Sequence, residues 1–398
     1  MNKGVAITGM GIISSIGNNV EENFNSLVAG NHGISHLELL ETRYQGILPA
    51  GEIKKTNEEL AVRLNFPEDK VNTRSSLLGT IAAREAIKSA VISDVSDAST
   101  GFISGTTVGG MDMTEKYYKK FWNGTEHHRY IESQHAGFST QEIAEYLGIH
   151  GFVTTVSTAC SSAANAIILG ARMIKAGKLD RVVVGGADCL SKFTLNGFNS
   201  LMILSEEPCK PFDQNRTGLN LGEAAAYLVL EADHLVQKGN KKVLGYLCGY
   251  DNSNDAFHQT ASSATGKGAF LAMEKALRSA NLKPENIDYI NVHGTATANN
   301  DLSEGMAVER LFQDSGVPVF SSTKSFTGHT LAAAASVEAV YSLLALQKNV
   351  VFPHLNFETP MEELSIAPQT ALLEMELNTV LSNSFGFGGN CSSLIFSK

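Results

Sequence analysis

Residues 153–170 of this 398-residue chain are VTTVSTACSSAANAIILG, a β-branched run that stops at Cys160 and continues in small and aliphatic residues. Val153 to Val156 has the composition of a strand, whereas residues 161–175 have too few charges for a solvated surface helix. The pattern predicts a strand, a turn that carries Cys160, and a helix packed against the interior.

Cys160 is thereby placed at the N-terminus of a helix, where unsatisfied N–H groups and the positive end of the helix dipole favour an anion. Such a place lowers the pKa of a thiol and supplies thiolate near neutral pH, as a nucleophile requires. A free cysteine is as often a small buried hydrophobic residue. On this stretch alone both interpretations stay open.

The length and composition indicate a globular protein with a large core. A chain of 398 residues exceeds one typical domain, so we expect two fused units or one large layered domain. The hydrophobic content is 43% and the charged content 18%, which excludes disorder as the main feature. The 36 glycines against 9 prolines predict many tight turns.

The sequence also argues against several classes of protein. No signal peptide and no run of about 18 apolar residues is found, so we expect a cytoplasmic protein that does not enter a membrane. Five cysteines without C-x-x-C spacing argue against a disulfide framework and a zinc site. The net charge of -10 argues against nucleic-acid binding.

The first half alternates strands with helices. Residues 4–17 predict a buried strand and a glycine-rich turn, but Ser14 replaces the third glycine of a dinucleotide-binding motif, so we discount that site. Continuous apolar strands that alternate with helices predict an α/β layered sheet. Helices are expected at 19–29, 72–91, 140–147 and 161–175, and strands at 101–106, 153–156, 181–188 and 224–231.

An aromatic and basic segment interrupts this alternation at residues 111–135, where Tyr117, Tyr118, Phe121 and Trp122 gather. It is either an insertion that covers a pocket or a subunit interface, or a cap on the core. We favour the cap.

The second half repeats the order of the first. Residues 238–242 form the best boundary, so we expect units at 1–242 and 243–398 that arose by internal duplication. Strands are expected at 243–250, 287–292, 317–321, 371–382 and 391–396, and helices at 266–280 and 331–347.

Two histidines of the second half each follow a predicted strand. His293 begins HGTAT, and His329 ends STKSFTGH. The carboxyl ends of strands are where α/β sheets place ligands. A lone histidine there is more often structural, but two of them, each flanked by glycine and threonine, shift the balance towards a functional site.

Three further features accompany these histidines. Lys324 follows an apolar strand and Glu338 lies within an apolar helix, so either they pair with each other when buried or they are an ordinary loop lysine and surface glutamate. Residues 383–390, NSFGFGGN, form either a loop with backbone N–H groups open to an oxyanion or a plain turn.

Taken in order, these motifs resemble the elongating β-ketoacyl-acyl-carrier-protein synthases of the thiolase superfamily, over essentially the whole chain. Each motif alone is moderately specific, but four at familiar spacing make a strong signal. The motifs are TACSS at 158–162, HGTAT at 293–297 followed by Asn300-Asp301, STKSFTGH at 322–329, and NSFGFGG at 383–389.

The resemblance implies an acyltransferase that performs a decarboxylative Claisen condensation of malonyl-carrier protein in fatty acid or polyketide-type elongation. Cys160 would hold the acyl chain as a thioester, with the N–H groups of Cys160 and Phe387 as oxyanion hole. His293 and His329 would bind the malonyl thioester carbonyl and stabilise the enolate. Phe387 would also gate entry.

The remaining site residues follow from the same resemblance. Lys324 and Glu338 would support the histidines, and Thr295, Thr297 and Phe385 would bind the substrate with its phosphopantetheine arm. No metal or dissociable cofactor is expected, because the arm arrives on the carrier protein.

The resemblance further implies a thiolase fold, two βαβαβαββ halves in a five-layer αβαβα sandwich. The protein would be a homodimer across the strand before Cys160, or a heterodimer with a chain-length-factor-like subunit. Val108, Met111 and Phe198 would line the acyl pocket.

Two departures from the family pattern concern the C-terminal loop and the carrier-protein contact. Asn390-Cys391 stands where Thr-Asn is usual, and Met202 stands near the place of a carrier-binding arginine. Docking would then rely on other basic residues: Lys54, Lys55, Arg63, Lys70, Arg74, Lys119, Lys120 or Arg129.

Two rival functions share the fold. A thiolase would carry a second cysteine in the C-terminal glycine-rich loop, and Cys391 lies close to that loop but outside its Gly388-Gly389 pair. A chain-length factor would lack the nucleophile, which this chain retains.

Overall fold

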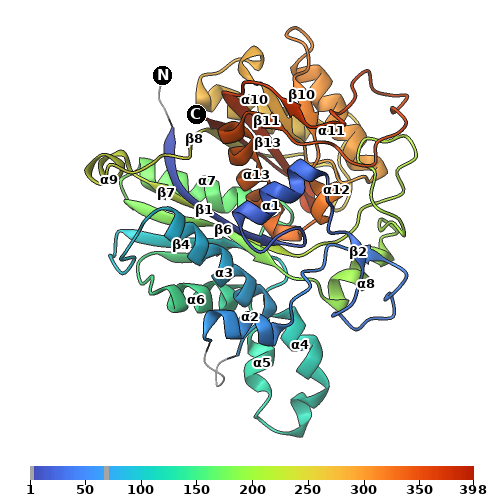
Figure 1. The fold of residues 1–398 in the computed structure, drawn as a ribbon. Helices are drawn as coiled ribbons and strands as arrows, with labels where there is room; N and C mark the ends of the chain where they lie inside the picture. Colours follow the sequence, from blue (N-terminus) through green and yellow to red (C-terminus); the bar gives the residue numbers. More distant parts are fainter. Residues whose placement is uncertain (1–3, 67–70) are drawn as a thin grey trace.

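The computed structural model describes residues 4–66 and 71–398 (Figure 1). Within these ranges a ten-stranded mixed sheet has the order β10-β9-β13-β14-β8-β1-β7-β6-β4-β5. Strands β1 and β8 pair antiparallel at its middle and join the two halves of the chain.

The two halves of the sheet have the same topology. Numbered along the chain, the strands of each half lie in the order 3-2-4-5-1, with the second strand parallel to its two neighbours and the last two pairings antiparallel. The first half contains β1 (Val5–Ser14), β4 (Thr100–Gly105), β5 (Val153–Val156), β6 (Arg181–Asp188) and β7 (Ala224–Glu231). The second contains β8 (Gly245–Asn254), β9 (Tyr289–Asn291), β10 (Val319–Ser321), β13 (Thr379–Gly386) and β14 (Asn390–Ser397).

Helices complete five layers around these strands. In Figure 1 the central layer, α7 (Ser162–Lys175) and α13 (Ala334–Lys348), lies between the two sheet halves and contacts both. The outer layers are α3 (Arg74–Ser89) with α6 (Ala136–Leu147), and α10 (Lys267–Ala280) with α11 (Ala298–Leu311). Each half therefore has the βαβαβαββ order that the resemblance implies.

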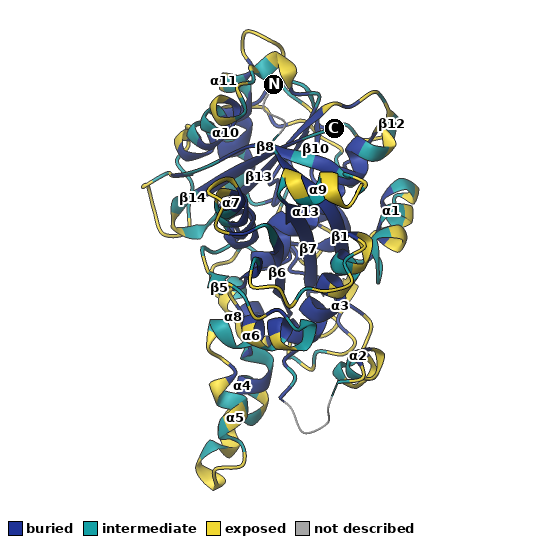
Figure 2. Cartoon of the chain, turned by 90° about the vertical axis from the view of Figure 1, so that its left-hand side faces the viewer, coloured by how far each residue is buried: buried dark blue, intermediate teal, exposed yellow. Residues whose placement is uncertain are grey.

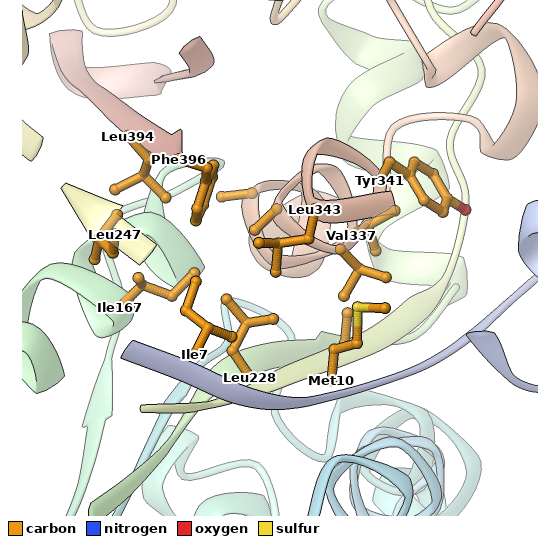
Figure 3. Close-up of a cluster of buried hydrophobic side chains, with 14 of the residues drawn as sticks. Ile7, Met10, Ile167, Leu228, Leu247, Val337, Tyr341, Leu343, Leu394 and Phe396 are labelled. Atoms are coloured by element: carbon orange, nitrogen blue, oxygen red, sulfur yellow. The ribbon is translucent and has the colours of Figure 1, made fainter. Parts of the chain in front are cut away.

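Helix α13 is buried on every side (Figure 2). Strands of both sheet halves cover it, and α7 and α1 (Val20–Ala29) also contact it. All of its residues from Ala334 to Leu346 are buried, which matches its nearly uninterrupted apolar sequence. Figure 3 shows Val337 and Leu343 of this helix among apolar side chains from both halves, including Leu228 of β7 and Phe396 of β14. The core thus fixes the two halves against each other.

The shorter elements connect these layers. The helices are α1 (Val20–Ala29), α2 (Asn57–Leu64), α8 (Lys192–Ser200), α9 (Asp233–Lys238) and α12 (Lys324–Thr327). The single-turn helices are η2 (Pro284–Asn286), η3 (Leu331–Ala333) and η4 (Phe387–Gly389), and the two-residue strands are β2 (Ser35–His36), β3 (Pro49–Ala50), β11 (Val350–Val351) and β12 (Leu373–Glu374).

The aromatic segment does not cap the core, so that prediction is wrong. Its elements α4 (Met111–Tyr117), η1 (Tyr118–Asn123) and α5 (His128–Glu132) form an arm that extends from the body (Figures 1 and 2). The aromatic rings pack on each other within the arm, as in the stack of Tyr117 on Tyr130 at 4.0 Å, while Trp122 is 81% exposed. Local stacking therefore replaces burial against the body.

Candidate active site

The chain segments after β5, β9 and β10 and the loop after β13 meet at one cavity of about 260 Å³. Cys160, His293 and His329 all line it, together with Phe385 and Phe387. The structure thus brings the nucleophile candidate of the first half to the two histidines of the second.

Cys160 lies in a tight turn whose backbone is strained. Ala159 has a φ of 51°, which is uncommon for a residue with a β-carbon. Hydrogen bonds hold this conformation, since Ser162 Oγ accepts from Thr158 N–H at 2.9 Å and donates to the carbonyl of Ala159 at 2.5 Å. Helix α7 begins directly after the turn, at Ser162.

The thiol itself does not behave as the helix N-terminus predicts. Burial raises the pKa of Cys160 to about 11, although the charge of Lys324 and the N–H groups of Phe387 and Cys160 act in the opposite direction. The expectation of a thiolate near neutral pH is therefore wrong for the resting site. The side chain is only 7% exposed, and loss of solvent outweighs the favourable dipoles.

Both histidines are neutral donors towards the cavity. Lys324 Nζ lies 3.2 Å from Nδ1 of His293, and the Leu331 N–H donates to Nδ1 of His329 at 3.0 Å, so each ring carries its proton on Nε2. Burial first, and then the charge of Lys324, lower the pKa of His293 well below its ordinary value and that of His329 to about 3. The two rings are perpendicular, with centroids 5.4 Å apart.

A glycine makes the position of His329 possible. Gly328 has a φ of 71°, and a β-carbon there would lie 2.6 Å from the carbonyl oxygen of Leu221. The backbone of His329 then donates to the carbonyl of Asn220 at 2.7 Å. Close approach of two backbones therefore requires glycine before this histidine.

Lys324 and Glu338 form a buried ion pair, not a loop lysine and a surface glutamate. Their side chains are 3% and 2% exposed, and they contact each other directly from α12 and α13. Burial raises the pKa of Glu338 to about 6, which the charge of Lys324 partly opposes. The ammonium group of Lys324 thus lies between Glu338 and His293.

A second cavity of about 200 Å³ lies on the other side of Cys160. Val108, Met111 and Phe198, the predicted acyl-pocket residues, all line it. Phe387 lines both cavities, and its ring stacks on Phe198 with centroids 5.8 Å apart. Phe198 also lines both, so this aromatic pair borders the two cavities.

The two threonines of the HGTAT motif line the first cavity. They are Thr295 and Thr297, and their hydroxyl oxygens are 2.8 Å apart. The ring of Phe385, which also lines this cavity, is 5.8 Å from that of His293.

The basic residues suggested for docking differ in availability. Arg74 is not a docking residue, because its guanidinium is paired with Glu223 at 2.6 Å and donates to the carbonyls of Ile53 and Lys55. Lys54 pairs with Glu52 at 2.8 Å. Lys70 lies outside the described residues. The exposed candidates are Lys54, Lys55, Arg63, Lys119, Lys120 and Arg129, and Met202 is 88% exposed at the cavity.

Two acidic residues of α11 belong to the site without a predicted role: Glu304 was missed, and Asp301 was quoted only as part of the histidine motif. The carboxylate of Glu304 accepts the N–H groups of His293 and Gly294, each at 2.8 Å, and that of Asp301 accepts Thr295 N–H at 3.0 Å. Burial raises the pKa of Glu304 to about 7. Their spacing of three residues on one helix face, just after the histidine motif, is the signal that would have found them.

Within residues 4–66 and 71–398 the structure has neither a candidate metal site nor a helix that could cross a membrane. No group of three or more His, Cys, Asp or Glu side chains there is arranged to hold a metal ion. The helices described in those ranges are all too short or too polar to cross a membrane. The cytoplasmic location stays a prediction.

Comparisons with known proteins cover the whole chain. A family model described as "Beta-ketoacyl synthase, N-terminal domain" matches residues 2–235, and one described as "Beta-ketoacyl synthase, C-terminal domain" matches residues 244–358. The chain is 31% identical to the 3-oxoacyl-[acyl-carrier-protein] synthase 2 of Staphylococcus aureus (strain N315), over 100% of this chain and 99% of that protein. It is 33% identical to a putative mitochondrial 3-oxoacyl-[acyl-carrier-protein] synthase of Schizosaccharomyces pombe, over 100% and 99%.

Solved structures agree with these matches. A chain of the solved complex between a Xenorhabdus doucetiae ketosynthase and its chain length factor is similar, with a TM-score of 0.86 and 32% identity, over 99% of this chain and 98% of that chain. The ishigamide ketosynthase/chain length factor gives a TM-score of 0.91 and 27% identity, over 100% of each chain. The predicted thiolase fold is confirmed.

Proposed function

This chain belongs to the β-ketoacyl synthase family, and we propose that Cys160 holds its acyl substrate while His293 and His329 bind a malonyl thioester. It is a condensing enzyme of the acyltransferase class, which elongates fatty acid or polyketide chains. The observation that supports these residue roles is the single cavity that the thiol and two neutral imidazoles share.

In the acylation step, the sulfur of Cys160 attacks the carbonyl carbon of an acyl thioester. The N–H groups of Cys160 and Phe387, both directed towards the sulfur, would stabilise the oxyanion that forms. The carbon–sulfur bond to the carrier then breaks, and the departing carrier sulfur takes the proton that the thiol loses. The raised pKa of Cys160 means that this proton leaves during the reaction and not before it.

In the condensation step, Nε2–H groups of His293 and His329 donate to the thioester carbonyl oxygen of a malonyl group. The bond to the carboxylate breaks, carbon dioxide leaves, and the electron pair becomes an enolate that these two donors stabilise. The enolate carbon attacks the acyl carbon on Cys160, whose sulfur leaves as a thiolate and takes a proton from solvent. The product is a 3-oxoacyl thioester, and no metal or dissociable cofactor takes part in these proposed steps.

Lys324 and Glu338 keep this arrangement in the required protonation state. The positive charge beside His293 disfavours an imidazolium and so preserves two hydrogen-bond donors with neutral rings. Glu338 compensates the lysine charge in the interior. Thr295, Thr297 and Phe385 would contact the phosphopantetheine arm, and Val108, Met111 and Phe198 the acyl chain.

A carrier protein and a second subunit are the proposed partners. The named relatives act with acyl-carrier protein, and the Xenorhabdus ketosynthase was solved with a chain length factor. Strand β5 is the last strand of the sheet, with side chains only half buried. Its edge, unpaired within the described sheet, fits a second copy or a chain-length-factor-like subunit. Within one chain, unit 1–242 would contribute the cysteine and unit 243–398 the two histidines.

Mass spectrometry after incubation with a panel of acyl-carrier proteins tests the proposal. The wild-type chain should gain one acyl group on Cys160, and Cys160→Ala should gain none while it still releases carbon dioxide from malonyl-carrier protein. A Cys160→Ala variant that condenses at the normal rate would refute the assignment. Transfer from coenzyme A esters as fast as from carrier protein would favour a thiolase, which the absence of Cys391 from the cavity lining already disfavours.

A further inference from the structure

The two donors of the proposed oxyanion hole come from opposite halves of the chain. Cys160 follows β5 of the first half, whereas Phe387 lies between β13 and β14 of the second. A preorganised hole requires that the two N–H groups keep a fixed distance from each other. Something must therefore hold one backbone segment against the other.

The two segments approach each other closely at Gly386. A β-carbon at Gly386 would lie 3.1 Å from the nitrogen of Cys160 and 3.1 Å from the carbonyl oxygen of Thr158. Both segments are also conformationally demanding, because Ala159 has a φ of 51° and the turn at Gly388 and Gly389 has φ values of 80° and 77°. Neither segment is expected to keep this geometry through backbone preference alone.

One carboxamide joins the two segments. The Oδ1 atom of Asn390 accepts hydrogen bonds from Ser161 Oγ at 2.8 Å, from Asn165 Nδ2 at 3.0 Å and from Asn252 Nδ2 at 2.6 Å. Ser161 is the neighbour of Cys160, and Asn390 follows the glycine turn that carries Phe387. The contacts thus begin one residue from the first N–H donor and three residues from the second.

A supporting network orients this carboxamide. Asn165 Nδ2 also donates to Thr158 Oγ1 at 2.8 Å, on the other side of the strained turn. Asn252 Nδ2 donates to Asn165 Oδ1 at 3.0 Å, and Ser392 Oγ donates to the same oxygen at 3.2 Å. The network is built entirely from neutral groups, so it adds no charge beside the oxyanion.

We propose that Asn390 is a positioning residue of the oxyanion hole, which sets the N–H groups of Cys160 and Phe387 relative to each other through Ser161 and Asn165. The inference rests on the proposed function, and it adds a residue outside the catalytic motifs. Asn390 does not line either cavity at Cys160 and acts only through its neighbours.

Two reactions of Cys160 separate this role from a merely structural one. Acylation by hexanoyl-N-acetylcysteamine forms a tetrahedral oxyanion, whereas alkylation by iodoacetamide forms none. Asn390→Ala should slow acylation by about 10-fold to 100-fold, since removing one oxyanion-hole donor outright costs about 100-fold to 1,000-fold. Alkylation should slow by a clearly smaller factor between pH 7 and 10, because misplaced N–H groups stabilise the thiolate less but no tetrahedral oxyanion forms.

A second variant and a matched control accompany this measurement. Asn252→Ala removes a donor to Asn390 but neither N–H group of the oxyanion hole. It should slow acylation by a smaller factor than Asn390→Ala does. Asn23→Ala is the control, because its amide oxygen likewise accepts two buried hydroxyls, Ser14 Oγ at 2.6 Å and Tyr341 OH at 2.8 Å, away from the cavities. It should lower the melting temperature and leave the ratio of the two rates unchanged.

Two outcomes would overturn the inference. Either Asn390→Ala acylates as fast as wild type, or its acylation and alkylation rates fall by the same factor. If that variant does not fold, an unchanged rate ratio in Asn252→Ala overturns the inference instead. Failure of the wild-type chain to acylate Cys160 would refute the proposed function, which is a different result from equal acylation of wild type and variant.

Discussion

The turn after β5 and the segment after β10 occupy equivalent places in the two halves of the molecule. Each follows the third strand of its half and leads into a central helix, α7 in one case and α13 in the other. The first is a short turn with one nucleophile candidate, Cys160. The second is longer and carries both Lys324 and His329.

The two places are held by different forces. Neutral hydroxyl and carboxamide groups hold the cysteine turn. A buried ion pair and a buried histidine hold the other, since Lys324 pairs with Glu338 and His354 Nδ1 accepts from Ser322 N–H at 3.0 Å. The duplicated scaffold therefore delivers side chains to one cavity, while the connecting residues decide whether a site supplies a nucleophile or hydrogen-bond donors.

The largest effect should come from removing Cys160 of the first turn or His293, the ring that Lys324 of the second segment contacts. Cys160→Ala should abolish acylation but not decarboxylation, whereas His293→Ala should keep acylation and lose roughly 1,000-fold in carbon dioxide release, because one enolate donor is gone. Rates of acyl-enzyme formation and of carbon dioxide release measure the two steps. Equal loss of both steps in both variants would contradict the division of labour.

The ion pair should matter most for stability. Lys324→Ala should lower the unfolding free energy by about 3 to 5 kcal/mol at pH 8, since it leaves Glu338 as an uncompensated buried charge. The loss should be smaller at pH 5, because the pKa of Glu338 is already raised to about 6 and the group can take a proton. Urea unfolding measures both values, and Lys324→Met combined with Glu338→Leu should be less harmful than Lys324→Ala.

Acid should destabilise the segment after β10 more than the cysteine turn after β5. Burial lowers the pKa of His354 to about 4 from an unfolded value of about 6.5, so its contribution to stability is full above pH 6.5 and is lost as the pH falls through that window. His354→Gln should remove a slope of about 1.4 kcal/mol per pH unit between pH 6.5 and 4.

The measurement is urea unfolding of wild type and variant across that range, with hydrogen exchange as control. At pH 5 exchange should rise in residues 322–333 of the wild type and stay unchanged in residues 157–165. Parallel stability curves for wild type and variant would show that His354 does not titrate as its burial predicts.

The smallest effect concerns chain length. Val108→Phe should fill part of the cavity behind Cys160 and lower acylation by about fourfold for each methylene group that no longer fits. Competition between short and long acyl-carrier proteins measures the ratio, with the exposed Val62→Phe as control. An unchanged preference would place the acyl chain elsewhere.

Local sequence patterns predicted most elements well. Strands β6 and β7 have the predicted limits, and α1, α7 and α10 begin within one residue of prediction, because apolar runs and caps are local signals. The aromatic arm was misjudged since a sequence shows that aromatic residues must pack but not against what. Arg74 was misjudged for the same reason, as its partner Glu223 lies far along the chain.

The motifs alone determined the family and the candidates for the reacting side chains, because both depend on residue type and spacing. Only the tertiary structure decided the environment of those side chains. Burial gave Cys160 a raised pKa, paired Lys324 with Glu338, and placed Asn390 and Glu304 behind the site. Such effects arise from atoms brought together across the two halves, and no local stretch of sequence contains them.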